Sequence, residues 1–275
     1  STAVTAAHLG LKVIVVEKDP HYGGTTAWSG GWMWIPRNPL AIQAGITEPI
    51  EKPLSYLRHE LGAQFDETRV RTFLTHGPRM VRFFQERSVC AAPFDGRQLG
   101  SRVKQLKRPL YEITFLGMGI ASGADLRHFF QALRSWKSFF HVAKRVTRHL
   151  LDLAIHGRGM QLVNGNALVA ALAKSAFDAG VDIRVNTPAV RLMTETGADG
   201  ALKVKGAVVM HNGVEQTLRA KRGVMLATGG FPHDPQRKRQ LLPHDPTGEQ
   251  HFSAASRGNT GDGLRLGESV GAVVA

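Results

Sequence analysis

The residues with the clearest chemical potential form a glycine-rich segment at positions 23–31. These nine residues, Gly-Gly-Thr-Thr-Ala-Trp-Ser-Gly-Gly, include four glycines and three hydroxyl side chains. Glycine lets a backbone approach a ligand closely, and the N–H and O–H groups can donate hydrogen bonds to a diphosphate or a flavin ring. A purely structural turn needs only one or two glycines. We therefore predict ligand contacts at Gly23, Gly24, Thr25, Thr26, Ser29, Gly30, Gly31 and Trp32.

An acidic residue ends an apolar run shortly before this segment. The run Val13-Ile14-Val15-Val16 is followed by Glu17 and Lys18. At the carboxyl end of the second strand of a nucleotide-binding βαβ unit, a carboxylate can accept hydrogen bonds from both hydroxyls of an adenosine ribose. The alternative is a surface carboxylate that only ends a strand. We take Glu17, with Lys18 beside it, as a candidate binding residue.

Two further glycine-containing turns occur late in the chain. They are Ala227-Thr228-Gly229-Gly230 and Asn259-Thr260-Gly261-Asp262-Gly263. The first would pack tightly against a ligand, and its alternative is a plain turn at a strand end. The second could also be an oxygen-rich cation loop, but one carboxylate makes a poor calcium site. No histidine spacing typical of a metal site is present, and we predict no metal.

The elements that position these residues follow from periodicity and turn signals. An Ala-rich helix at 2–9 and a second helix at 167–179 each end at a glycine and lead into an apolar strand. His211-Asn212-Gly213 predicts a hairpin, because Asn-Gly tolerates positive φ. The predicted strands lie at 13–16, 181–185, 190–194, 204–210, 214–218 and 224–228. This order is typical of an α/β fold with a parallel sheet and a small antiparallel β-meander.

Residues 45–160 have helical spacing and predict a helical insertion over this core. Within it, residues 134–154 form a basic amphipathic helix, with apolar residues three or four apart and lysines and arginines between them. We favour a cap helix packed on its own domain. The alternative is docking on a membrane surface.

Composition excludes several classes of protein. The chain has 275 residues, 43% of them hydrophobic, and a formal net charge of +13. The basic residues are scattered and accompany no nucleic-acid-binding motif, so we expect no nucleic acid partner. Cys90 is the only cysteine, which excludes an internal disulfide and any cysteine-cluster metal site. We expect a cytoplasmic protein, with membrane association left open, and no membrane-spanning helix.

The motifs together resemble those of one flavoprotein family. Val-Val-Glu-Lys followed by Gly-Gly-Thr-Thr-Ala-Trp-Ser-Gly-Gly-Trp-Met-Trp-Ile-Pro is similar to the second FAD-binding signature of the 3-oxosteroid 1-dehydrogenases and of their fumarate reductase relatives. The resemblance implies that Thr187-Pro188-Ala189-Val190 borders the adenine, with Ala189 and Val190 as contacts. The resemblance also implies that 227–231 forms the family's second Gly-Gly turn and that 258–263 forms its flavin-side loop. The implied cofactor is FAD.

The resemblance also implies a domain plan for a Rossmann-like FAD-binding domain. Its first part spans 1–44, the helical insertion 45–160 and its second part 161–263, and a substrate domain starts at 264–275. The first strand and its Gly-rich turn would precede residue 1. We therefore expect the 275 residues alone to bind FAD poorly and to lack dehydrogenase turnover.

The family's activity implies hydride transfer between an apolar ketone and the flavin N5, most directly the 1,2-dehydrogenation of a 3-oxosteroid. Tyr111 is a weak catalytic candidate in the insertion. Trp28, Trp32 and Trp34 favour an apolar, ring-shaped substrate, and core packing explains them as well. The alternatives are a fumarate reductase or succinate dehydrogenase-like enzyme acting on a dicarboxylate, and an inactive flavin-binding fragment. The sequence does not indicate the electron acceptor.

Overall fold

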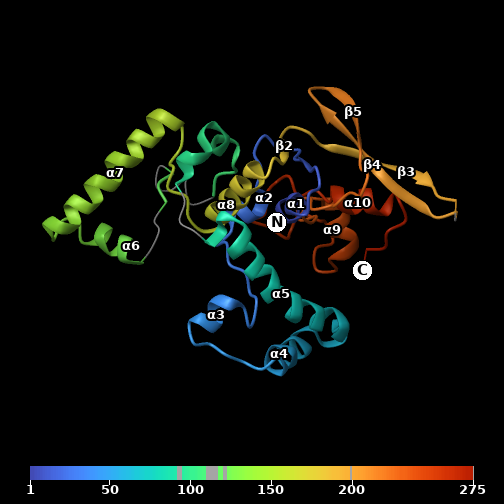
Figure 1. The fold of residues 1–275 in the computed structure, drawn as a ribbon, viewed down its shortest axis with the longest axis horizontal. Coiled ribbons are helices and arrows are strands. Elements are labelled where there is room, and N and C mark those ends of the chain that lie inside the picture. Colours follow the sequence, from blue (N-terminus) through green and yellow to red (C-terminus); the bar gives the residue numbers. More distant parts are fainter. Residues whose placement is uncertain (92–94, 110–116, 120–122, 199, 275) are drawn as a thin grey trace.

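The body of the protein is a small α/β unit with two helical arms (Figure 1). The structure is a computed structural model that describes residues 1–91, 95–109, 117–119, 123–198 and 200–274. Strand β1 (Ile14–Val16) pairs in parallel with β2 (Asp182–Arg184). Helices α1 (Thr2–His8) and α8 (Asn164–Asp178) pack against these strands through a shared apolar cluster.

The two predicted helix–strand pairs are confirmed, with slightly different limits. Both helices end one or two residues before a glycine in the left-handed region, Gly10 with φ 78° and Gly180 with φ 75°. Such a residue stops a helix and redirects the chain into the following strand. Ile14 lies opposite Asp182 and Val16 opposite Arg184. The sequence pattern therefore located the parallel pair correctly.

The predicted meander is also confirmed. Strands β3 (Ala189–Thr196), β4 (Leu202–His211) and β5 (Val214–Arg219) form an antiparallel sheet in the order β3-β4-β5. His211 pairs with Val214 across a two-residue turn. Asn212 and Gly213 in that turn both have positive φ, 51° and 77°, as a tight hairpin requires.

The strand expected at 224–228 is absent: these residues are described, and they form no strand. A strand needs a neighbour that exchanges backbone hydrogen bonds with it, and the ladder of β1 runs to β2 alone among the described strands. Val224 is 38% exposed and Met225 is 67% exposed, so the prediction of a buried strand was wrong. An apolar run indicates that a segment suits a sheet, but it does not supply the partner.

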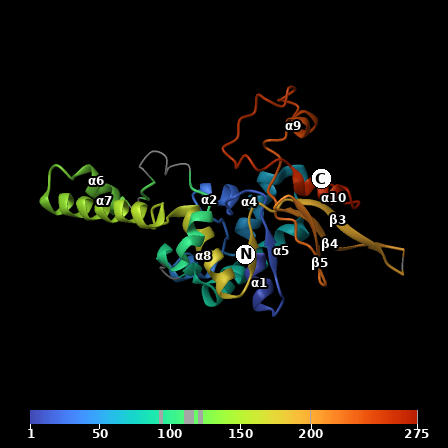
Figure 2. The same ribbon diagram turned by 90° about the horizontal axis from the view of Figure 1, so that it is seen from above.

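The helical region is arranged as two arms and a part of the body. Helices α3 to α5 form one arm, and α6 with α7 forms a second arm that projects in another direction in both views (Figures 1 and 2). The arms comprise α3 (Pro39–Gln43), α4 (Glu51–Leu61), η1 (Gly62–Gln64), α5 (Glu67–Arg87), α6 (Gly123–Phe130) and α7 (Trp136–His156). The domain limits given above remain a prediction.

The described residues between the arms, such as those of the 3₁₀ segments η2 (Val89–Ala91) and η3 (Gly96–Gln105), belong to the body. Leu99, Val103 and Leu106 pack in one buried cluster with Tyr22 and residues of α8. The Tyr22 N–H donates to the Gln105 carbonyl at 2.8 Å. The chain after the first arm therefore closes the core beside the glycine-rich segment.

The last part of the chain carries α9 (Pro235–Leu241) and α10 (Asp262–Glu268), joined by a long loop. Asp234 caps α9 by accepting from the Arg237 N–H at 3.1 Å. Within the described ranges, none of the helices combines the length and the apolar composition that crossing a bilayer requires.

A buried arginine joins η3 to α8. Arg158 is 1% exposed. Its guanidinium donates to the carbonyls of Val103 and Leu106, at 2.9 and 2.7 Å, and to Asn166 Oδ1 at 3.0 Å. A buried guanidinium is tolerated when its donors are hydrogen-bonded in this way. The contact fixes the end of η3 over the first turn of α8.

We expect Arg158→Met to lower the free energy of unfolding by about 2–4 kcal/mol, because it removes the guanidinium donors of the buried Leu106 carbonyl and Asn166 Oδ1. Urea denaturation measures the change. Arg191→Met is the matched control: Arg191 pairs with Glu215 at 3.3 Å, the Arg191 side chain is 58% exposed, and we expect less than about 1 kcal/mol. Equal losses in the two variants would show that Arg158 has no special role.

Candidate functional site

The carboxyl end of β1 carries the first part of the site. The Glu17 N–H donates to the Arg184 carbonyl at 2.8 Å, and the Thr187 N–H donates to the Glu17 carbonyl at 2.8 Å. The Asn186 N–H donates to the Asp19 carbonyl at 3.0 Å. These bonds fix the end of β1 against the residues that follow β2, as the motif order predicts.

The glycine-rich segment 23–31 contains the short helix α2 (Gly24–Trp28), so it is not a loop throughout. Ser29 ends this helix. Its Oγ donates to the Thr26 carbonyl at 2.8 Å and accepts from the Gly31 N–H at 3.0 Å. The Ser29 hydroxyl therefore holds the segment in shape.

The four glycines divide into two pairs with different surroundings. A Cβ at Gly23 would lie 2.8 Å from the Cβ of Ala27, and one at Gly31 would lie 2.5 Å from the backbone nitrogen of Gly165. Gly24 has no heavy atom within 4 Å of such a Cβ, and Gly30 meets the Trp32 ring alone. Gly23 and Gly31 are thus required by packing, Gly24 borders open space that a ligand can use, and Gly30 lies against the Trp32 ring, 3.2 Å from the position of such a Cβ.

The last of the predicted loops lies against this segment. Thr25 Oγ1 accepts hydrogen bonds from the Ser256 N–H and from Asn259 Nδ2, both at 3.0 Å. The Gly261 N–H donates to the Gly230 carbonyl at 3.1 Å. Three motifs that lie far apart in the sequence therefore meet in one place.

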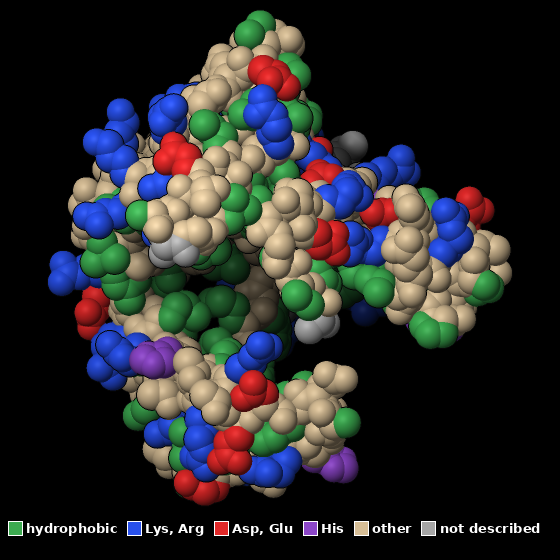
Figure 3. Space-filling view, turned by 90° about the vertical axis from the view of Figure 1, so that its right-hand side faces the viewer, with side chains coloured by type: hydrophobic (Ala, Val, Ile, Leu, Met, Phe, Trp, Pro, Cys, Tyr) green, Lys and Arg blue, Asp and Glu red, His purple; other side chains and the backbone are tan. Residues whose placement is uncertain are grey.

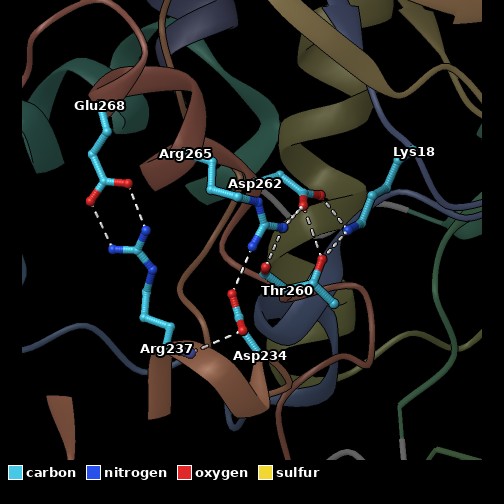
Figure 4. A network of polar contacts seen from close by, with 7 residues as sticks. All are labelled: Lys18, Asp234, Arg237, Thr260, Asp262, Arg265 and Glu268. Atoms are coloured by element: carbon cyan, nitrogen blue, oxygen red, sulfur yellow. Dashed lines mark hydrogen bonds and ion pairs between the residues drawn. The ribbon is translucent and has the colours of Figure 1, made fainter. Parts of the chain in front are cut away.

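A network of ion pairs joins the same loop to β1 (Figure 4). Lys18 pairs with Asp262 and donates to Thr260 Oγ1 at 2.8 Å. Arg265 pairs with Asp262 at 2.6 Å and with Asp234 at 2.7 Å. Lys18 and Asp262, both predicted from sequence, thus contact each other, and Arg265 and Thr260 are additions made by the structure.

Lys107 is another residue of the site that the sequence motifs missed. Its Nζ lies 2.5 Å from Asp19 Oδ2, 2.6 Å from Ser256 Oγ and 5.2 Å from the centre of the Trp28 ring. The backbone N–H of Lys107 donates to the Tyr22 carbonyl at 2.8 Å. Asp19 and Ser256 adjoin predicted motifs and could have been found from that position, but Lys107 stands in no recognisable pattern.

A cavity of about 750 Å³ opens beside Trp28. Among its lining residues are His233, Lys238, His251 and Arg257. The Trp28 Nε1 is buried without a hydrogen-bond partner among the described residues. A buried donor without an acceptor is costly, and a bound ligand would satisfy it.

Aromatic rings lie exposed near the end of the glycine-rich segment. Trp34 stacks on Phe73 with ring centres 6.2 Å apart and contacts Tyr56 at 5.7 Å. Figure 3 shows a hollow, lined largely by hydrophobic side chains, between the arm of α3 to α5 at the bottom and the body above it. This face suits an apolar molecule.

Several predicted residues lie outside this meeting point. Trp32 is 93% exposed, Val190 is 45% exposed, and Ala189 pairs with Val209 within the meander. Ala227, Thr228, Gly229 and Gly230 are exposed too, but they belong to the meeting point, because Gly229 lies against the Asn259 side chain and the Gly230 carbonyl accepts from the Gly261 N–H. Tyr111 falls outside the described residues.

Burial and the neighbouring cations shift the pKa values of two carboxyl groups in the site. Burial raises the pKa of Glu17 above its ordinary value, although the Asp19 N–H donates to its carboxylate at 3.0 Å. Burial also acts to raise the pKa of Asp262, but the hydrogen bond and charge of Lys18, with Thr260 and Arg265, outweigh it and the pKa is lowered. The positive groups thus keep Asp262 ionised.

As the pH is lowered, we expect the Lys18→Met variant to begin losing stability at a higher pH than the unchanged protein does. A carboxylate with a lowered pKa stabilises the fold above its unfolded pKa and loses that contribution as the pH falls through the folded pKa. Without Lys18, the pKa of Asp262 rises and the loss begins earlier. The check is the urea midpoint between about pH 3 and pH 7. Lys205→Met, an exposed control, should follow the unchanged profile, and coincident profiles for all three proteins would exclude the coupling.

Comparison with known proteins agrees with this geometry. Residues 1–275 match the family described as FAD binding domain. The chain is 33% identical to the 4-oxocyclohex-2-ene-1-carboxylate 5-dehydrogenase of Sinomonas cyclohexanicum, over 97% of this chain and 48% of that protein. It is 30% identical to the 3-oxosteroid 1-dehydrogenase of Mycobacterium tuberculosis (strain H37Rv), over 99% of this chain and 52% of that protein. The chain thus spans about half the length of these relatives.

Solved structures give the same picture. The 3-ketosteroid delta1-dehydrogenase of Sterolibacterium denitrificans, solved with 1,4-androstadiene-3,17-dione, matches with a TM-score of 0.78 and 32% identity, over 98% of this chain and 52% of that one. A flavocytochrome c3 fumarate reductase shares the fold, with a TM-score of 0.59 and 22% identity over 99% of this chain and 38% of that one. With the family match over its whole length, the chain belongs to the FAD binding domain family, and its cofactor is FAD.

Proposed function

We propose that the protein containing this chain is an FAD-dependent dehydrogenase that removes two hydrogens from a CH–CH bond beside the carbonyl of an apolar ring ketone, such as the 1,2 bond of a 3-oxosteroid. The observation that carries this proposal is the position of the glycine-bordered site beside exposed aromatic rings. Two relatives are named as dehydrogenases of 3-oxosteroids and of 4-oxocyclohex-2-ene-1-carboxylate, and these names support the proposal.

The residues of the site fit FAD. Open space at Gly24 allows a close approach of a ligand to the backbone, and the Trp28 indole N–H is a free donor among the described residues. We assign Glu17 to the ribose hydroxyls, as its place after β1 predicts. The segment 23–31 and the loop 256–263 would then hold the diphosphate and flavin ends.

The reaction needs an acceptor for a hydride and one for a proton. When bound, FAD supplies the hydride acceptor. Tyr22 is unsuited to the proton step, because it is buried in the core, its hydroxyl donates to the Arg102 carbonyl at 3.1 Å and burial raises its pKa to about 12. Tyr56 is 53% exposed beside Trp34. Tyr111 remains the catalytic proposal, together with groups elsewhere in the protein.

Two surfaces of the chain favour different substrates. The rings of Trp34, Tyr56 and Phe73 favour an apolar ring system. The cavity beside Trp28 is lined by Lys238 and Arg257 and would suit a carboxylate. The second candidate is therefore a substrate with one or two carboxylates, including the dicarboxylate of a fumarate reductase-like enzyme. An inactive flavin-binding protein is the third candidate.

We also propose a peripheral membrane contact through residues 134–154, now part of α7. An apolar ketone partitions into lipid, so an enzyme at a membrane surface would meet more of its substrate. Phe140 and Leu150, on the apolar side of α7, are 65% and 53% exposed, and this exposure favours the membrane contact over a cap helix packed on its own domain. The helix stands away from the body in both views (Figures 1 and 2).

For the cofactor, we expect Lys107→Met to weaken FAD binding by about tenfold or more, because Asp19 would then be an unpaired negative charge near a dianionic diphosphate. Lys107→Arg should retain part of the affinity. Quenching of flavin fluorescence on titration with apoprotein measures the dissociation constant. The apoprotein's unfolding midpoint tests for simple misfolding, and Lys205→Met is the surface control. Unchanged affinity in Lys107→Met would remove Lys107 from the site.

For the reaction, we expect the FAD-loaded protein to lose its flavin absorbance when a 3-oxosteroid is added without oxygen, since flavin reduction bleaches that band. A parallel sample receives 4-oxocyclohexanecarboxylate, and a third receives chemically reduced dye followed by fumarate. Bleaching by the steroid alone supports the apolar ketone. Bleaching by the keto acid alone, or reoxidation by fumarate, supports the carboxylate candidate. A band that responds to none of them supports an inactive flavoprotein.

A further inference from the structure

The loop between β2 and the meander is held from two sides. Residues 186–188 lie in this loop, just before β3. On one side, the Thr187 N–H donates to the Glu17 carbonyl at 2.8 Å. On the other side, the Met210 N–H donates to the Pro188 carbonyl at 2.9 Å. The loop therefore links the end of β1, where the site begins, to the end of β4.

A histidine side chain adds a second contact from the end of β4. Thr187 is 0% exposed, and its Oγ1 lies 2.8 Å from Nδ1 of His211. The same hydroxyl donates its proton to the Val185 carbonyl at 2.9 Å. A threonine hydroxyl has only one proton to donate, so toward His211 it accepts. His211 therefore carries a proton on Nδ1, which makes it the donor in this contact.

The meander gives His211 a firm support. His211 is the last residue of β4 and pairs with Val214 across the turn of Asn212 and Gly213. Strand β4 lies between β3 and β5, and its residue Val209 is 0% exposed. A side chain on a central strand is held more precisely than one on a loop. The half-buried imidazole is thus a fixed point against which the loop can be set.

The contacts run in one line from the meander to the residue that we assign to the ribose. The His211 Nδ1–H donates to the Thr187 hydroxyl, and the Thr187 backbone donates to the Glu17 carbonyl. The Asp19 N–H donates to the Glu17 carboxylate at 3.0 Å. A binding group must be held within about 0.5 Å of its productive position to keep its affinity. Loss of the His211 donor would loosen Thr187, and with it the backbone of Glu17.

We propose that His211 is a positioning residue of the cofactor site, which acts through Thr187 to fix Glu17 and the carboxylate that binds the adenosine ribose. The proposal rests on the FAD site proposed above and extends it to the meander. His211 acts through Thr187 alone and needs no contact with the cofactor.

The test uses two nucleotides that differ only at the ribose, ADP and dideoxy-ADP, which lacks both ribose hydroxyls. Competition with FAD, followed by flavin fluorescence, gives the affinity of the protein containing this chain for each. His211→Ala should weaken the binding of FAD and ADP about fivefold, the effect of about one hydrogen bond. The affinity for dideoxy-ADP should change less than about twofold, because it has no hydroxyl for Glu17 to bind. Glu17→Gln should show the same selectivity.

Matched variants separate the hydrogen bond from the size of the side chain. His211→Asn should keep the affinity for ADP, because the asparagine Nδ2 lies close to the place of the imidazole Nδ1. His211→Gln carries the same amide one carbon further out and should behave like His211→Ala. Thr187→Val should have the same effect, and His211→Ala added to it should cost nothing more. His59→Ala, exposed in α4, is the control and should bind like the unchanged protein.

Three results would overturn the proposal. Equal losses for ADP and dideoxy-ADP in His211→Ala would show a purely structural role. Full affinity in His211→Ala, with a selective loss in Glu17→Gln, would remove His211 and leave the FAD site intact. A Glu17→Gln variant that does not distinguish the two nucleotides would refute the ribose assignment, and the role of His211 with it. Where the unfolding midpoint shows that His211→Ala is poorly folded, the contrast between His211→Asn and His211→Gln decides.

Discussion

The ion pair between Lys107 and Asp19 is the contact on which the assembly of the site depends. It joins the end of β1 to the chain that leaves η3, and Ser256 brings the last loop to the same ammonium. Placing a partly buried ammonium here costs desolvation, which its second hydrogen bond, to Ser256 Oγ, helps to offset. The backbone of Lys107 is held as well, by the Tyr22 carbonyl and by Asn166, whose Nδ2 donates to the Lys107 carbonyl at 2.6 Å. Three distant segments are therefore fixed by one side chain.

Much of the fold could be predicted because its signals are local. A glycine in the left-handed region ends α1 and α8, the Asn212-Gly213 pair sets the hairpin of β4 and β5, and apolar runs locate β1 and β2. The positions of Glu17 after a strand and of Thr25 in the glycine-rich segment are local in the same way, while their contacts with FAD stay predictions. Each of these features needs only a few neighbours in sequence to be defined, so the sequence pattern contains it.

What the sequence could not give depends on partners far along the chain. Arg158 contacts carbonyls more than fifty residues away, and Lys107 reaches Ser256 over 149 residues. The apolar run at 224–228 has strand composition, yet strand formation depends on a neighbour that the described sheet does not provide. Gly31 illustrates a mixed case. Its type suggested ligand contact, whereas the close approach of Gly165 shows that packing alone already requires glycine there.

The direction in which the apolar side of α7 points is another feature that the sequence pattern alone does not determine. Periodicity defines an apolar side and a basic side, and this pattern is identical whether the apolar side faces the core or the surroundings. Two buried carboxylates fix the direction. Asp125 of α6 pairs with Arg145 of α7, and Asp152 of α7 pairs with Arg97 of the body. Because those carboxylates must stay paired, the apolar side faces outward. The basic residues next to it are then the charged groups that any surface approaching the apolar side meets first.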